Sequence, residues 1–137
     1  MSSRIKMSNP NTMPKPGGAY SHVARVSAGA LLFIAGQVAI DSSGKVVGEG
    51  DFEAQAAQVF ANLRAALQSE GADFQHVVQL TTYLVDSRDI AKLRRFRDKT
   101  YPGFFPEGKY PPNTLLVVDR LASEEIRLEI AAIAAPD

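Results

Sequence analysis

Apolar residues on both faces of the predicted strands limit the folds open to this chain. Leu31 and Phe33 point to one face of a predicted strand and Leu32 and Ile34 to the other, and residues 114–121 repeat this pattern. A sheet covered on one side only should alternate apolar and polar residues instead. At ~25 cal/mol per Å², a second apolar face left in water costs several kcal/mol. We therefore expect that helices cover one face and that another copy of the chain covers the other.

A helix that can cover one face is predicted for residues 52–67, where apolar residues recur at three- and four-residue spacing. Asp51 is a suitable N-cap, and Gly71 ends the helix. A second helix is predicted to begin near Ser87, its expected N-cap. Pro102 should weaken or kink that helix near its end.

The rest of the chain predicts an extended N-terminal arm and several strands. Residues 1–18 contain three prolines and two glycines, which disfavour both a helix and a central strand. Gly36 interrupts a strand and suggests a bulge or a close backbone approach. The predicted order is β-β-β-α-β-α-β-β in one α/β (α+β) domain over residues 1–137, with a mixed sheet and two helices on one face. The predicted strands are 22–26, 30–35, 45–47, 77–85, 114–121 and 126–134.

Composition excludes several classes of function. The 15 Lys and Arg residues balance the 15 Asp and Glu residues, so no global field attracts nucleic acid or an anionic membrane. The absence of cysteine removes thiolate nucleophiles, iron–sulfur clusters and cysteine-based zinc sites. The two histidines have no metal-ligand spacing, so we expect no metal. The longest apolar run, residues 28–35, is far shorter than the ~20 residues that span a bilayer. With no signal-peptide pattern, a cytoplasmic protein is expected.

Glu129 is the candidate catalytic residue. In the last predicted strand it lies on the face opposite Leu128 and Ile130, in apolar surroundings that disfavour its charged form. Such a carboxylate could take a proton from water. The alternative is a structural ion pair with Arg127 or with a cation on a neighbouring strand.

Three polar residues elsewhere are candidates for a ligand site. Tyr20 closes a segment that begins with Gly17, where the backbone can approach a ligand closely. Taken alone, this residue is more typical of a tyrosine that covers the edge of the core. His22 is more typical of a hydrogen-bonded structural residue than of a catalyst. Asn113 follows two prolines and is either a turn residue or a ligand-facing amide.

Basic residues form a stripe on the second predicted helix. Arg88, Lys92, Arg95 and Lys99 lie on one face, and Arg94 and Arg97 widen it. Contact with a phosphate backbone is one interpretation. Net neutrality and the lack of interleaved aromatic residues favour a solvated face, so we expect no specific nucleic-acid partner.

Taken together, short motifs over most of the chain resemble the RidA (YjgF) family, also called L-PSP endoribonuclease. The resemblance runs from about Pro14 to Ala134, and the order of the motifs makes it strong. The motifs are Gly17-Gly18-Ala19-Tyr20-Ser21, Leu32 to Val38, Gln55-Ala56 with Asn62-Leu63, Thr81 to Asp86, Tyr101 with Phe104-Phe105-Pro106, and Leu128 to Ala134.

The resemblance implies a chorismate-mutase-like fold and a homotrimer with ligand clefts between subunits. It also implies hydrolysis of reactive enamines and imines to 2-keto acids and ammonia, without metal or organic cofactor. In that family a glutamate orients the water and a tyrosine lines the cleft, which here correspond to Glu129 and Tyr20. The resemblance adds Asn113, Thr114 and Gly36 to Tyr20 as candidate substrate-binding residues.

Asn113 departs from the family pattern, because this position corresponds to the arginine that holds the substrate carboxylate. A charged bidentate contact stabilises by roughly 1.5–3 kcal/mol, against ~0.5–1.5 kcal/mol for a neutral amide. Three functions therefore stay open: imine or enamine hydrolysis, metabolite binding by a non-catalytic trimer, and RNA cleavage. Arg25 and Lys109 are candidate replacement cations if the carboxylate is still bound.

Overall fold

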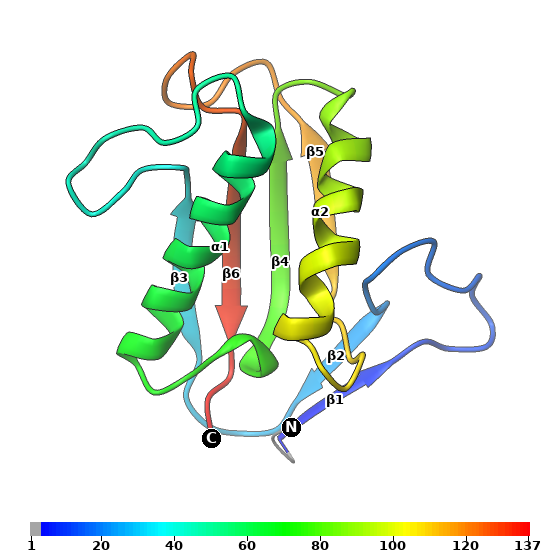
Figure 1. The fold of residues 1–137 in the computed structure, drawn as a ribbon. Helices are drawn as coiled ribbons and strands as arrows, with labels where there is room; N and C mark the ends of the chain where they lie inside the picture. Colours follow the sequence, from blue (N-terminus) through cyan, green and yellow to red (C-terminus); the bar gives the residue numbers. More distant parts are fainter. Residues whose placement is uncertain (1–3) are drawn as a thin grey trace.

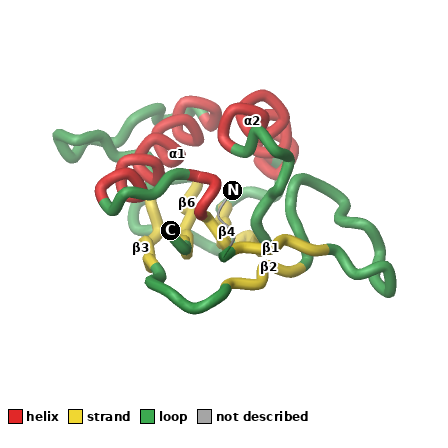
Figure 2. Tube along the Cα trace, turned by 90° about the horizontal axis from the view of Figure 1, so that it is seen from below, coloured by secondary structure: helices red, strands yellow, loops and turns green. Residues whose placement is uncertain are grey.

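Two helices cover one face of a mixed four-stranded sheet, as Figures 1 and 2 show. The computed structural model describes residues 4–137. A separate two-stranded sheet lies at one end of the molecule. The elements are β1 (Ile5–Ser8), β2 (Val23–Val26), β3 (Leu32–Gln37), α1 (Phe52–Ser69), a 3-10 turn (Phe74–His76), β4 (Val77–Leu84), α2 (Asp89–Phe104), β5 (Asn113–Val117) and β6 (Leu128–Ala134).

The strand order in the main sheet is β3-β6-β4-β5. β6 pairs antiparallel with both β3 and β4, whereas β4 and β5 are parallel. A parallel pair needs a crossover connection, which α2 provides. The sheet is therefore mixed, and the α+β fold class predicted from sequence is confirmed.

The core lies between the helices and the sheet. Asp51 accepts a hydrogen bond from the backbone N–H of Ala54 (3.1 Å) and caps α1 as predicted. Phe60 on α1 is 2% exposed. Its ring lies 5.5 Å from Phe96 and 5.3 Å from Phe104, both of α2. Aromatic packing thus joins the two helices above the sheet.

The opposite face of the sheet stays open within one chain. Phe33 is 73% exposed and Leu116 is 40% exposed. Their neighbours Leu32 and Leu115 pack against the helix-covered core, so apolar residues do lie on both faces. The sequence pattern that predicted two-sided burial is therefore present in the structure.

The N-terminal strands differ from the prediction, although the order β-β-β-α-β-α-β-β is the same. Residues 5–8 form β1 and pair with β2, although no strand was predicted in this part of the extended arm. The prolines all follow β1, so they do not prevent it; residues 1–3 of the expected arm lie outside the described residues. Residues 45–47 form no strand but one isolated bridge, between Ile40 and Val46.

Several boundaries differ as well. Arg88, not Ser87, occupies the N-cap position of α2, and its side chain makes no capping bond. Pro102 lies inside α2, which continues to Phe104. β5 ends at Val117, and β6 begins at Leu128, so both are shorter than predicted. Neither helix of the described chain has the length and apolar character needed to cross a membrane.

Candidate functional site

A cavity of about 360 Å³ lies between the N-terminal loop, α2 and the start of β5. It brings Tyr20 and Asn113, two of the predicted ligand-binding residues, onto one surface. Its polar and flexible lining comes from Gly17, Gly18, Tyr20, Arg94, Arg97 and Asn113. Ile90, Leu93 and Leu115 form an apolar wall. A concave site with an apolar wall and few polar groups is typical of small-molecule binding.

Hydrogen bonds hold the N-terminal loop in place beside β5. The Ser21 hydroxyl donates to the carbonyl of Tyr110 at 2.5 Å. His22 Nε2 lies 2.7 Å from the carbonyl of Pro14, and its ring meets Tyr20 edge-on at 5.7 Å. His22 therefore makes structural contacts within the loop, and these contacts fix the position of Tyr20.

A short hydrogen-bonded chain links α2 to Asn113. Arg97 Nη2 donates to Thr82 Oγ1 (3.1 Å), and Thr82 Oγ1 donates to Asn113 Oδ1 (2.8 Å). Thr82 is fully buried on β4. Asn113 is therefore not a turn residue, because it begins β5 and lines the cavity, where Thr82 links its amide to Arg97.

Arg97 also contacts the aromatic core. Its guanidinium carbon lies 5.5 Å from the centre of the Tyr101 ring, a cation–π geometry. Burial raises the pKa of the Tyr101 phenol, and the charge and hydrogen bond of Arg97 partly offset this rise. Tyr101 is therefore a neutral partner for Arg97 at ordinary pH.

Glu129, Gly36 and Thr114 lie on the open face of the sheet, away from this cavity. Leu128 and Ile130 are fully buried beneath the helices, so the alternation of β6 turns Glu129 to the opposite side. Thr114 is likewise on the side opposite Leu115, which packs into the helix-covered core.

Gly36 and Glu129 are in close contact at a bulge. The register between β3 and β6 shifts between Ile34 and Gln37, which confirms the predicted irregularity at Gly36. A Cβ atom at residue 36 would overlap the Glu129 carboxylate. Glycine at this position therefore makes room for the carboxylate.

Arg127 forms its ion pairs with Asp89 and Asp86, and not with Glu129 as the structural alternative for Glu129 predicted. Its Nη2 lies 2.8 Å from Asp89 Oδ2 and 3.7 Å from Asp86 Oδ2. Among residues 4–137, Glu129 forms no ion pair. The residue opposite it on the neighbouring strand β4 is Tyr83. The ion-pair alternative for Glu129 is therefore wrong for Arg127, and no described cation takes its place.

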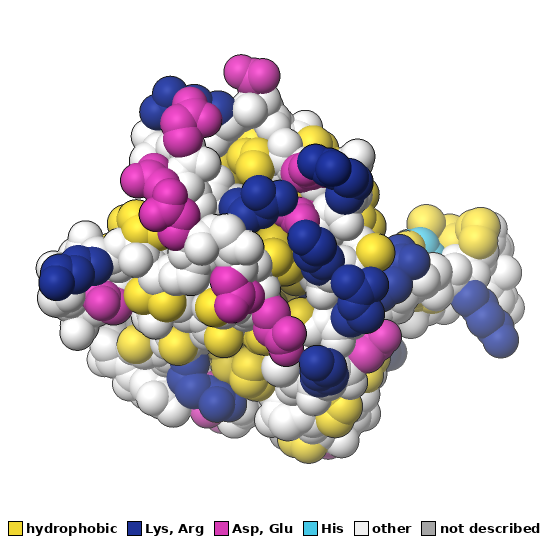
Figure 3. Space-filling model, turned by 45° about the horizontal axis from the view of Figure 1, so that its top comes forward, with side chains coloured by type: hydrophobic (Ala, Val, Ile, Leu, Met, Phe, Trp, Pro, Cys, Tyr) yellow, Lys and Arg dark blue, Asp and Glu magenta, His cyan; other side chains and the backbone are white. Residues whose placement is uncertain are grey.

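Three of the six basic residues of the α2 stripe form ion pairs, and Figure 3 shows Lys and Arg side chains gathered over this side of the molecule. Arg88 lies 2.6 Å from Asp86, Lys92 3.3 Å from Asp89, and Lys99 3.3 Å from Glu53. Partnered charges on an exposed helix face are typical of a solvated surface.

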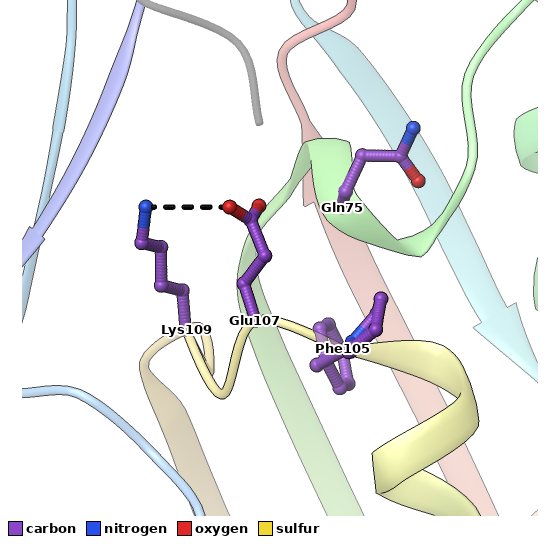
Figure 4. A pocket seen from close by; sticks show the side chains of 5 residues that line it. Gln75, Phe105, Glu107 and Lys109 are labelled. Carbon is purple, nitrogen blue, oxygen red and sulfur yellow. Dashed lines mark ion pairs between the residues drawn. The ribbon is translucent and has the colours of Figure 1, made fainter.

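A second cavity, of about 340 Å³, is lined by Gln75, Phe105, Pro106, Glu107 and Lys109 (Figure 4). Lys109 Nζ lies 3.7 Å from Glu107 Oε1. Lys109 does not line the cavity with Tyr20 and Asn113, and Arg25 lies on β2 outside it. Within one chain, neither of these two cations therefore lies in the cavity with Asn113.

Arg97 is the residue that sequence reasoning missed, because it was assigned to the solvated stripe. Its spacing carried a signal: Ile90, Leu93, Arg97 and Tyr101 recur at three- and four-residue intervals along α2. An arginine on the buried stripe of a helix needs a polar partner or a ligand.

In the described part of the chain, no cluster of His, Asp and Glu could hold a metal ion.

The fold is that of a small α+β protein with an open, apolar sheet face and a cavity beside α2. Residues 10–136 match the model of the family described as Endoribonuclease L-PSP. The chain belongs to this family, which also includes the RidA, YjgF and RutC proteins.

Relatives and solved structures agree with this placement. A RutC family protein of Pyrococcus horikoshii is 38% identical over 121 residues, covering 88% of this chain and 90% of its own length. A Salmonella typhimurium protein named 2-iminobutanoate/2-iminopropanoate deaminase is 30% identical, covering 87% of this chain and 90% of its own length. A Rid-family protein of unknown function from Yersinia pestis has a TM-score of 0.84 at 34% identity, covering 96% and 98% of the two chains.

Proposed function

We propose that this chain forms a trimer that hydrolyses small imines or enamines in clefts between its copies. The observation that carries the proposal is the Glu129 carboxylate, held over Gly36 without a described cation to neutralise it. The relative named 2-iminobutanoate/2-iminopropanoate deaminase supports the choice of substrate.

The division of the site supports the need for a second copy. Tyr20 and Asn113 line the cavity beside α2, whereas Gly36 and Glu129 lie on the open face. The exposed Phe33 gives that face an apolar surface for association. In the assembly, the open face of one copy supplies the carboxylate to the cavity of the next.

The reaction uses water and one base. Glu129 accepts a proton as the water oxygen bonds to the imine carbon. The proton then passes to the nitrogen, which gives a carbinolamine with an OH and an NH2 group on the former imine carbon. Glu129 next takes the hydroxyl proton and delivers it to the amine, so the C–N bond breaks as the C=O bond forms and ammonia leaves. An imine is already electrophilic, so a positioned water and a base suffice.

The test follows the decay of 2-iminopropanoate released by a dehydratase. Wild type should accelerate the decay, and Glu129→Gln should reduce the acceleration about 100-fold or more, as removal of a general base does. Glu49→Gln, at an exposed loop position, is the matched control and should keep full activity.

Metabolite binding without catalysis is the second candidate, favoured by Asn113 in the arginine position. If neither wild type nor Asn113→Arg accelerates the imine decay, this second candidate becomes the better supported one. RNA cleavage receives less support, because Arg88, Lys92 and Lys99 already pair with carboxylates.

A further inference from the structure

Arg97 is a half-buried cation without a carboxylate partner among residues 4–137. Its Nη2 donates to the neutral hydroxyl of Thr82, and its Nε is buried without an acceptor. A guanidinium withdrawn from water is costly unless an anion compensates it. The charge of Arg97 is therefore still available to an anionic ligand.

Arg97 shares a cavity wall with Asn113, and one hydroxyl group separates the two. Arginine can only donate, so Thr82 accepts from Arg97 and gives its own proton to Asn113 Oδ1. This arrangement directs the donor end of the amide, Nδ2, away from Thr82. The wall thus combines a positive charge with neutral N–H donors, as a carboxylate requires.

The remaining charge around the cavity has the same sign. Arg94, one helical turn before Arg97, also lines it, and no Asp or Glu does. Arg94 is exposed, so water screens its charge more than that of Arg97. The field inside the cavity therefore favours anions, and Arg97 is the stronger source of that field.

We infer that Arg97 binds the carboxylate of the ligand, and that a cation on α2 replaces the arginine expected on β5. The inference rests on the proposed function only in placing the ligand in this cavity. It assigns the chain to small organic carboxylates, such as 2-keto and 2-imino acids, rather than to neutral imines.

The test measures binding of 2-oxobutanoate and of its neutral amide by calorimetry, using the full chain. Wild type should prefer the carboxylate by about ten-fold or more, the range of a charge-assisted contact. Arg97→Gln should abolish this preference, and Arg97→Lys should keep part of it. Arg95→Gln, at an exposed arginine of the same helix outside this cavity, is the matched control and should change affinity by less than about three-fold.

A rescue variant separates loss of charge from loss of structure. Asn113→Arg in the Arg97→Gln background returns a guanidinium to the same wall and should restore the preference. The inference is overturned by a wild type without preference, by an Arg97→Gln variant that keeps it, or by a double variant that stays at the Arg97→Gln level.

Failure of this inference and failure of the proposed function give different results. Arg97-dependent carboxylate binding without imine turnover would refute hydrolysis and support the inference. Imine turnover that Arg97→Gln leaves unchanged would support hydrolysis and overturn the inference.

Discussion

The two faces of the four-stranded sheet differ in how far their apolar residues are buried. On the covered face, Phe60 of α1 is 2% exposed, and rings from α2 surround it. On the open face, Phe33 is 73% exposed. The first face is completed by the chain itself, whereas the second carries Glu129 and is suited to a neighbour. The chain alone therefore buries the apolar residues of one side of the sheet and leaves those of the other side exposed.

Truncating a buried aromatic side chain on the covered face should have the largest effect on stability. Phe60→Ala removes a ring that contacts Phe74, Phe96, Tyr101 and Phe104. We expect the free energy of unfolding to fall by about 3–5 kcal/mol, measured by urea denaturation. Met13→Ala, at a loop residue that is 45% exposed, should cost about 0.5 kcal/mol or less. Equal losses in the two variants would contradict the assignment of the core.

A charge on the open face should act on association instead. Phe33→Glu places a carboxylate on the apolar surface, and we expect association to weaken by about 2 kcal/mol, roughly thirty-fold. Sedimentation equilibrium should show smaller species with an unchanged circular-dichroism spectrum. Phe33→Leu, which keeps the surface apolar, should stay associated. A wild type that is monomeric at micromolar concentration would refute the trimer.

The N-cap of α1 should contribute less to the free energy of unfolding than the core aromatic ring does. Asp51→Ala leaves the N–H of Ala54 without its side-chain acceptor, so unfolding should become easier by about 1 kcal/mol. Asp51→Ser keeps an acceptor and should retain most of the stability in the same denaturation assay. A loss of equal size in both variants would show that the cap does not act through this bond.

Replacement of Asp86, which precedes α2, should have the smallest effect on stability. The hydrogen bonds from Arg88 hold the pKa of the Asp86 carboxyl well below its usual 3.8. Because the folded pKa is lower than the unfolded one, this contribution is present above pH 4 and is lost as the pH falls further. Thermal unfolding between pH 5 and pH 2 should show a slightly weaker acid dependence for Asp86→Asn than for wild type. Identical slopes would contradict this role.

Local signals predicted the helices better than the N-terminal strands. The periodicity of residues 52–67 and the Asp51 cap are local, and both were confirmed. β1 was missed because its four residues precede a proline-rich segment and are stabilised by distant partners. These partners are β2, through strand pairing, and a small cluster in which Ile5 meets Val78 and Ala135.

The site could be predicted only in parts. The alternation of residues shows which residues share a face of one strand, but not which face of another strand lies on the same side of the sheet. Tyr20 and Asn113 do share a cavity, yet Glu129 is on the other side of the sheet. Relating the two faces requires the strand order, which depends on contacts far apart in the chain. Arg97 was different, since its place on the apolar stripe of α2 was visible in the spacing.

The position of β6 also bears on how the protein folds as it is made. β6 is the last strand in the sequence, but it lies between β3 and β4, which were synthesised long before it. The sheet cannot close until the ribosome has released residues 128–134, so β3 waits without its partner while about ninety later residues emerge. During this delay the unpaired edge of β3 is open to pairing with another chain.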